Sequence, residues 1–253
     1  MEREFNIYGV QYNFTSSSND SVKCLDWFLP LFKEGGWESD TFKIFECVKD
    51  RDKVAVDIGA WIGPTSIWLS NNFKNVISIE PDPIAYKALK DNLKNSNCNN
   101  AITVNRPCYN EEKEIVFGVN SFDKNLAREG LGSSTSQIKT TTDDSQDCIQ
   151  TAITLKYLTN FSVFSEICFV KVDIEGGEEY ILLDLFEYAQ KNRWKLYISF
   201  HYNWWREKNI LKYKKLFNTP ALNNIRVYNK NLTGNELIYY IINNPFCSVY
   251  FEF

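Results

Sequence analysis

The sequence has only one histidine, His201, and no pair of cysteines with CxxC spacing. A metal site built from several histidines is therefore excluded, and a zinc ribbon is not expected. The seven cysteines are odd in number and do not suggest a disulfide framework. No long apolar run is present, so we expect neither a secretory signal nor a membrane span, and we predict a soluble, cytoplasmic protein.

An excess of basic charge is also absent. Lysine and arginine number 28 against 32 aspartates and glutamates, which leaves a net charge of -4. Such a chain has no general positive field to attract phosphates, so nucleic acid is not expected as a partner. The basic cluster of Lys212, Lys214 and Lys215 lies in a helix-like stretch and is better explained as a solvated helix face.

What the sequence does contain is an alternation of short β-branched runs with helix-period segments, which predicts βαβ units. The expected strands are Val54–Ile58, Val76–Ile79, Ile102–Val104, Ile167–Val172, Leu196–Phe200, Ile225–Tyr228 and Ser248–Phe253. The expected helices are Pro64–Asn72, Pro83–Asn95, Glu178–Lys191, Trp204–Phe217 and Gly234–Ile242. This pattern predicts an α/β fold with a doubly wound, mostly parallel, seven-stranded Rossmann-like sheet. Helices should cover both faces, and a ligand should bind at the carboxyl ends of the strands.

Two regions interrupt the alternation. Residues 1–50 form a leader with an expected helix, Asp40–Val48, capped by Ser39, and this leader is expected to close over the cofactor or substrate. Residues 51–253 then make up the sheet domain, and we expect a single domain overall. Residues 120–150 are rich in Gly, Ser, Thr and Asp and indicate a long loop, in which we predict that Phe122–Ile149 is a mobile lid.

The first expected strand runs into an acidic residue and a glycine turn, Asp57-Ile58-Gly59-Ala60-Trp61-Ile62-Gly63. A dinucleotide site needs GxGxxG, because the middle glycine lets the backbone approach a pyrophosphate. Here Trp61 lies inside a Gly-x-x-x-Gly turn instead. S-Adenosylmethionine has no phosphate but needs the same tight turn between strand and helix. The turn therefore favours S-adenosylmethionine over a nicotinamide dinucleotide as the cofactor.

The second strand also ends in a carboxylate. Glu80 follows Gly59 by about 20 residues, the spacing at which Rossmann-like folds bind ribose hydroxyls. We predict that Glu80 binds the ribose, whereas Asp82 has the alternative role of capping the next helix. The expected cofactor-binding residues are Asp57, Gly59, Ala60, Trp61, Gly63, Glu80, Pro81 and Asp82.

Two segments resemble the FkbM family of methyltransferases, which are small-molecule O-methyltransferases of the class I Rossmann-like fold. Val56–Gly63 is similar to the family's DxGAxxG turn, and Phe169–Glu178 is similar to its KxDxEGxE motif. The resemblance covers about residues 37–200. Trp61 and Lys156 depart from it, since the family commonly has asparagine and aspartate at those places.

The second motif supplies three expected catalytic residues, Lys171, Asp173 and Glu175, at the carboxyl end of the fourth strand. His201 ends the fifth strand at the same edge of the sheet, so we expect these side chains to meet. We predict that His201 is the general base, ahead of Asp173, and that Asp173 and Glu175 hold the substrate or the cofactor. Alternatively, Lys171 only pairs with Asp173 or Glu175. We assign no metal ligand, although Asp173, Glu175 and His201 together would suit magnesium.

These expectations combine into methyl transfer from S-adenosylmethionine to a hydroxyl of a small molecule, with a sugar or glycan as the preferred acceptor. Tyr202, Trp204 and Trp205 follow His201 and either stack on a sugar ring or pack the next helix onto the sheet. A lipid or peptide acceptor and an inactive S-adenosylmethionine-binding module are the alternatives. The sequence does not indicate an oligomeric state.

Overall fold

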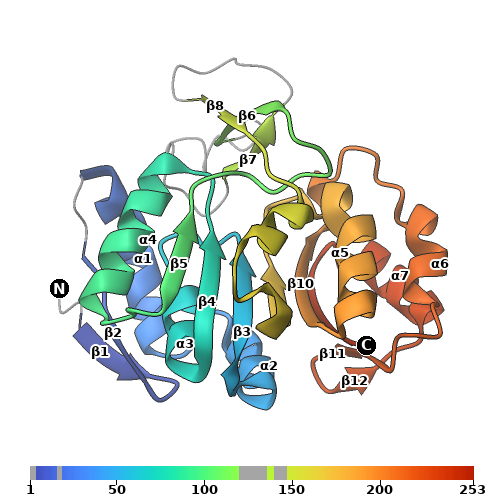
Figure 1. Ribbon diagram of the computed structural model, residues 1–253, viewed down its shortest axis with the longest axis horizontal. Coiled ribbons are helices and arrows are strands. Elements are labelled where there is room, and N and C mark those ends of the chain that lie inside the picture. Colours follow the sequence, from blue (N-terminus) through green and yellow to red (C-terminus); the bar gives the residue numbers. More distant parts are fainter. Residues whose placement is uncertain (1–3, 16–18, 120–135, 140–146) are drawn as a thin grey trace.

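The computed structural model describes residues 4–15, 19–119, 136–139 and 147–253, and at its centre is an eight-stranded sheet (Figure 1). The strand order is β12-β11-β13-β10-β9-β3-β4-β5. The strands that run parallel to one another are β3 (Asp50–Ile58), β4 (Phe73–Ile79), β5 (Ala101–Val104), β9 (Ile167–Val172) and β10 (Lys195–His201). The remaining strands are β13 (Phe246–Glu252), antiparallel to both neighbours, β11 (Asn224–Val227) and β12 (Lys230–Asn231). The expected α/β fold is confirmed, with the two-residue edge strand β12 in addition to the seven strands expected.

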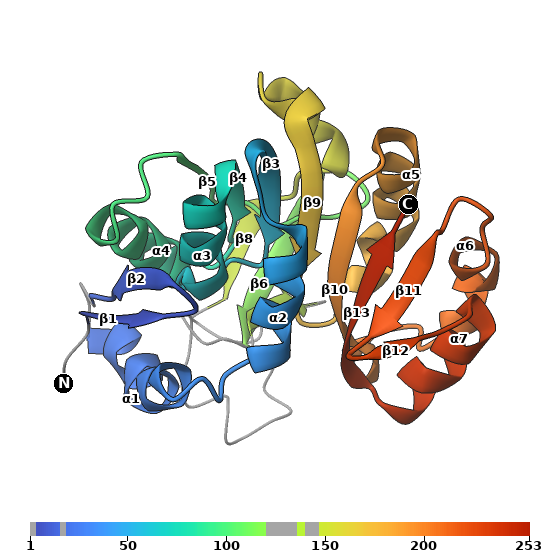
Figure 2. The same cartoon turned by 90° about the horizontal axis from the view of Figure 1, so that it is seen from below.

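Two hydrophobic cores lie on the two faces of this sheet. Successive side chains of a strand point to opposite faces, so β3 gives Val56 and Ile58 to one core and Ala55 to the other. The helices that cover these faces are α5 (Glu178–Asn192) and α7 (Gly234–Asn243) on the first and α2 (Ser39–Val48), α3 (Pro64–Asn72) and α4 (Pro83–Asn95) on the second (Figure 2). Each large apolar side chain that is fully buried contributes about 1.5 to 3 kcal/mol, which makes the two cores the main source of stability.

The helices α3, α4, α5 and α7 begin and end within one residue of the boundaries expected from the sequence. Asp82 caps α4, because its carboxylate accepts hydrogen bonds from the backbone N–H groups of Ile84 and Ala85 at 2.8 and 3.0 Å. The alternative expected for Asp82, that it caps this helix, is thus confirmed. Within the described ranges, no helix is long and apolar enough to cross a membrane.

The single helix expected over Trp204–Phe217 is wrong. The chain forms three short helical turns instead, η3 (Tyr202–Trp204), η4 (Ile210–Tyr213) and α6 (Lys214–Phe217). The backbone N–H groups of Arg206 and Glu207 donate to the buried carboxylate of Glu179 in α5 at 2.9 and 3.3 Å. Lys208 then has a left-handed φ of 47°, which a continuous right-handed helix cannot contain, so the chain divides into short turns.

The leader contains a hairpin as well as helices. Its elements are β1 (Glu4–Ile7), β2 (Val10–Asn13), α1 (Asn19–Lys33) and α2. The expected helix at Asp40–Val48 is α2, but the expected cap is wrong. Ser39 is the first residue of α2, and Glu38 precedes it in a left-handed conformation with a φ of 45° and makes no side-chain cap.

Aromatic rings join the leader to the sheet. The ring of Phe45 in α2 lies 5.5 Å from Trp68 of α3 and 5.3 Å from Phe169 of β9. Phe28 of α1 lies 5.1 Å from Trp61 in the glycine turn. The leader therefore packs into the same hydrophobic core as α3 and the central strands.

A second, smaller sheet borders the carboxyl ends of β3 and β4. It has the order β7-β6-β8 and consists of β6 (Glu114–Val119), β7 (Ser136–Lys139) and β8 (Cys148–Thr151), all antiparallel (Figure 1). The loop expected over residues 120–150 is wrong where β7 and β8 are described. Most of the predicted lid, Phe122–Ile149, lies outside the described residues.

Candidate active site

The glycine turn after β3 is closed against the turn after β9. Gly59 donates from its backbone N–H to the carbonyl oxygen of Ile79 at 2.9 Å and has a left-handed φ of 84°. A Cβ atom at Gly59 would lie 1.8 Å from the carbonyl oxygen of Asp173. Only glycine fits here, and this close approach places the first sequence motif directly beside the second.

Asp57 and Lys171 form a buried ion pair beneath the glycine turn. Asp57 Oδ1 lies 3.0 Å from Lys171 Nζ, and Asp57 Oδ2 accepts hydrogen bonds from the hydroxyls of Thr65 and Ser66 at 2.7 and 2.6 Å. Lys171 Nζ also donates to the carbonyl oxygen of the first glycine of the turn at 2.8 Å. Burial lowers the pKa of Lys171, but the neighbouring carboxylates, Asp57 above all, outweigh burial and the net pKa is raised. Lys171 is a cation that holds the turn; its closest carboxylate is Asp57, with Asp173 Oδ2 farther away at 3.7 Å.

Glu80 lies at the end of β4 with its carboxylate against the backbone of the glycine turn. Its Oε2 accepts a hydrogen bond from the backbone N–H of Trp61 at 2.7 Å, and its Oε1 accepts one from that of Asp82 at 2.8 Å. Burial raises the pKa of Glu80 to about 8, and the charge of Asp82 acts in the same direction. Glu80 thus ties the ends of β3 and β4 together at the place where the ribose is expected.

A cavity of about 160 Å³ opens at this edge of the sheet. The residues expected at the site that line it are Gly59, Ala60, Trp61, Glu80, Pro81, Lys171, Asp173 and Glu175. Lining residues that the sequence did not point to are Trp37, Glu38, Pro64, Thr65, Phe117 and Ile174. Asp57, Gly63, Asp82 and His201 do not line the cavity, although Asp57 and His201 contact the lining residues Lys171 and Asp173.

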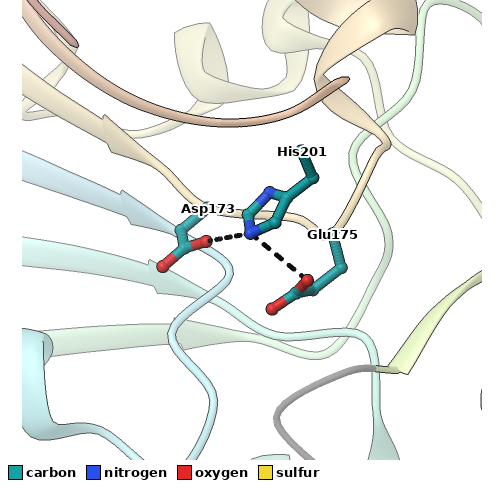
Figure 3. A group of neighbouring side chains, drawn as sticks. All are labelled: Asp173, Glu175 and His201. Atoms are coloured by element: carbon teal, nitrogen blue, oxygen red, sulfur yellow. Dashed lines mark ion pairs between the residues drawn. The ribbon is translucent and has the colours of Figure 1, made fainter. Parts of the chain in front are cut away.

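At one end of the site, Asp173, Glu175 and His201 converge as expected (Figure 3). His201 Nε2 lies 3.6 Å from Asp173 Oδ1 and 3.3 Å from Glu175 Oε2. Burial lowers the pKa of His201, but the surrounding carboxylates outweigh burial and raise the pKa to about 10. Burial raises the pKa of Glu175 to about 8. At neutral pH the imidazole is therefore a cation and has no free lone pair to accept a proton. The role of His201 as general base stays a prediction, and the positive charge of the ring does not favour it.

Glu178, which ends the second motif and was not among the expected site residues, determines how His201 is oriented. It is fully buried at the start of α5, and its Oε1 accepts a hydrogen bond from His201 Nδ1 at 3.0 Å. The same oxygen accepts the backbone N–H groups of Ile174 and Gly176, each at 3.2 Å. Because Nδ1 is held in this way, Nε2 is the ring nitrogen that faces Asp173 and Glu175.

Glu38 brings a further carboxylate to the cavity from the leader. Its Oε2 accepts a hydrogen bond from the hydroxyl of Thr41 at 3.1 Å, and that hydroxyl is 2.7 Å from the hydroxyl of Tyr197 in β10. Burial and the charge of Asp173 raise the pKa of Glu38 to about 7. Glu38 is thus a cavity carboxylate that exchanges its proton near neutral pH.

The family of the chain follows from a comparison of its sequence. Residues 57–233, more than half of the chain, match the methyltransferase FkbM domain. The chain belongs to the FkbM methyltransferase family. The expected family, enzyme class and cofactor are thereby confirmed: the protein is a methyltransferase, and S-adenosylmethionine is its methyl donor.

Several solved structures resemble this FkbM chain. A methyltransferase FkbM from Methylobacillus flagellatus KT is 14% identical with a TM-score of 0.49, over 94% of this chain and 56% of that one. SMU.1697c from Streptococcus mutans, in complex with SAH, is 13% identical with a TM-score of 0.43, over 83% and 93% of the two chains. TYW2 from M. jannaschii, in complex with AdoMet, is 15% identical with a TM-score of 0.42, over 100% and 85%. The chain thus spans little more than half of the Methylobacillus protein, and no curated protein matches it.

The three aromatic residues that follow His201 have different places in the FkbM chain. Trp205 is fully buried, and Tyr202 packs against the same core. Trp204 alone stacks on the imidazole, with ring centres 5.3 Å apart and planes 11° from parallel. Phe246 of β13, which is 54% exposed, meets Trp204 edge-on at 5.3 Å. An aromatic surface of Trp204 and Phe246 therefore adjoins the acidic end of the site.

Proposed function

We propose that this methyltransferase acts on a hydroxyl group of a small molecule, with a sugar or glycan as the acceptor. The observation that carries the proposal is one cavity whose wall contains both the glycine turn with Glu80 and the carboxylates Glu38, Asp173 and Glu175. The first group suits the cofactor, and the second suits a polar acceptor that must lose a proton.

The cofactor would lie across the ends of β3 and β4. The backbone near Gly59 would contact its methionine portion, and Glu80 would bind its ribose. Glu80 is suited to this because its carboxylate lines the cavity while backbone N–H groups hold it in place. Trp61 would form part of the wall, since it is buried against aromatic rings of the leader.

The acceptor hydroxyl would approach the methyl group in line with the carbon–sulfur bond. The methyl group would leave sulfur for the hydroxyl oxygen, which gives S-adenosylhomocysteine, and the hydroxyl proton would pass to a carboxylate. We assign this proton to Glu38, because it lines the cavity and its pKa of about 7 suits a general base at neutral pH. Asp173 and Glu175 would then hold the acceptor, as expected from the sequence.

A sugar is favoured among acceptors because aromatic and carboxylate side chains occur together at this end of the site. The aromatic surface of Trp204 and Phe246 offers an apolar face for a sugar ring, and Asp173 and Glu175 offer acceptors for its hydroxyls.

Calorimetry with S-adenosylhomocysteine tests the cofactor part of the proposal. Glu80→Ala should weaken binding by about 1 to 3 kcal/mol, the usual effect of leaving a hydrogen-bonding group without its partner. Glu187→Ala, at an exposed position of α5, is the matched control and should bind as the wild type does. Equal affinity in Glu80→Ala would place the ribose elsewhere.

Transfer of a labelled methyl group to panels of glycans, lipids and peptides tests the acceptor. Label in glycans alone supports the proposal, and label in lipids or peptides replaces the acceptor class. Cofactor binding without transfer to any panel would identify the chain as an inactive binding module.

A further inference from the structure

We infer that Asp173, Glu175 and His201 form a binding site for one divalent metal ion at the carboxyl ends of β9 and β10. Its role in presenting the acceptor hydroxyl to the methyl group rests on the proposed function, whereas the binding of the ion does not.

The three side chains have the spacing of metal ligands. One ligand atom from each lies within 4.8 Å of the other two, and the contacts of His201 Nε2 with the two carboxylates are 3.3 and 3.6 Å (Figure 3). Two ligand atoms that each lie about 2.1 Å from one ion are about 3.0 to 3.5 Å apart. The two contacts of His201 Nε2 are thus close to this spacing, and the oxygens of Asp173 and Glu175, which lie within 4.8 Å of each other, would move together around the same ion.

The imidazole is oriented as in known metal sites. A histidine that binds a metal usually donates its other ring N–H to a carboxylate, which fixes the tautomer and the ring plane. His201 Nδ1 has such a partner in the fully buried Glu178 Oε1 at 3.0 Å. When a metal ion replaces the proton on Nε2, the lone pair of Nε2 points toward Asp173 and Glu175 and can bind the ion.

The charges around the site also favour a cation. Glu38, Asp173 and Glu175 bring three carboxylates to the wall of the cavity, and Lys171, the only lysine or arginine among the described residues of that wall, is closest to Asp57. Glu175 Oε2 is a fully buried atom that accepts no hydrogen bond from any described residue. Its nearest cationic group is the imidazole of His201 at 3.3 Å, and a metal ion between the two would give this oxygen a direct ligand bond.

The ligand set indicates which ion to expect. Carboxylate oxygens suit magnesium and manganese, and an imidazole nitrogen shifts the preference toward transition metals, so Mn²⁺ fits two carboxylates and one histidine. An ion here would reach the acceptor oxygen and lower the pKa of its hydroxyl, which eases loss of the proton to Glu38.

Electron paramagnetic resonance with Mn²⁺ and the purified, metal-stripped protein tests the site, because the signal of free Mn²⁺ falls as the ion binds. We expect about one bound ion per chain. Glu175→Gln and His201→Gln should each weaken binding at least tenfold, and Glu187→Gln, which changes an exposed glutamate, should not. Circular dichroism and S-adenosylhomocysteine binding check that each variant is folded, and Asp173→Asn replaces any variant that is not.

The metal site is refuted if the wild type binds no Mn²⁺, or if the folded site variants bind it as tightly as the control. Binding of S-adenosylhomocysteine and methyl transfer without bound Mn²⁺ would refute the site and leave the proposed function intact. Stoichiometric Mn²⁺ binding that the site variants abolish supports the site even when no acceptor is methylated, an outcome that counts against the proposed function alone.

Discussion

Replacing Glu178 with glutamine perturbs the contacts that hold the acidic end of the active site. The Glu178 carboxylate accepts hydrogen bonds from the backbone N–H groups of Ile174 and Gly176, from His201 Nδ1 and from Trp205 Nε1, at distances from 3.0 to 3.2 Å. Glutamine has the same size but only one oxygen, and its amide N–H groups would face another donor. At least one buried donor is then left without an acceptor.

We expect Glu178→Gln to lower the free energy of unfolding by about 3 to 5 kcal/mol, the usual cost of breaking a buried, hydrogen-bonded charge pair. Urea unfolding monitored by tryptophan fluorescence measures this loss. Glu179→Gln is the matched control. Glu179 is also buried and accepts hydrogen bonds from two backbone N–H groups, but it makes no contact with His201. Its replacement should lower the free energy of unfolding by less, about 1 to 3 kcal/mol.

The single histidine of the chain makes a second measurement possible. His201 gives the only imidazole signal in a ¹⁵N NMR spectrum, so its pKa can be followed without assignment. In the wild type we expect a pKa near 10, raised by Glu178 and the other carboxylates against the effect of burial. Glu178→Gln should lower this pKa by at least about one unit, and Glu179→Gln should leave it unchanged. An unchanged pKa in Glu178→Gln would refute the role of Glu178 in charging the imidazole.

The interaction between His201 and Glu178 also makes the free energy of unfolding depend on pH. Folding raises the pKa of His201 from 6.5 to about 10, so the folded state binds this proton more tightly than the unfolded state. The resulting stabilisation is fully present below about pH 6.5 and is lost as the pH rises toward about 10, up to roughly 5 kcal/mol in all. The stability difference between the wild type and His201→Gln should therefore shrink across this window. A difference that grows with pH would contradict the assigned charge.

Further predictions concern the glycine turn and the aromatic surface of Trp204 and Phe246. Lys171→Met should destabilise the protein by about 3 to 5 kcal/mol in urea unfolding, because it leaves Asp57 buried without its cation. Gly59→Ala should prevent native folding or cofactor binding, since its Cβ would lie 1.8 Å from a carbonyl oxygen. Gly9 also has a positive φ, but an added Cβ would meet open space there. Gly9→Ala should therefore lower the free energy of unfolding by only about 1 to 2 kcal/mol. Trp204→Ala should raise the KM for a sugar acceptor up to about tenfold and leave cofactor affinity unchanged.

Much of the fold is readable from the sequence because it depends on neighbouring residues. The strand and helix positions follow from local periodicity, and Asp82 caps α4 through amides two and three residues ahead. The glycine turn and the acidic motif are likewise local, and the rule that parallel strands end at one edge is enough to bring Asp173, Glu175 and His201 together. The sequence by itself therefore determines the fold class, the family and the edge of the sheet where the site lies.

The tertiary structure decides what depends on contacts between distant residues. Glu38 reaches the cavity only because the leader packs on the sheet, and the amides of Arg206 and Glu207 find their acceptor in Glu179 of α5. The charge of His201 is set by Glu178, 23 residues away in the chain, and by the burial of both side chains. Electrostatic interactions in a buried site depend on distance and on exclusion of water, and neither is encoded in the order of neighbouring residues.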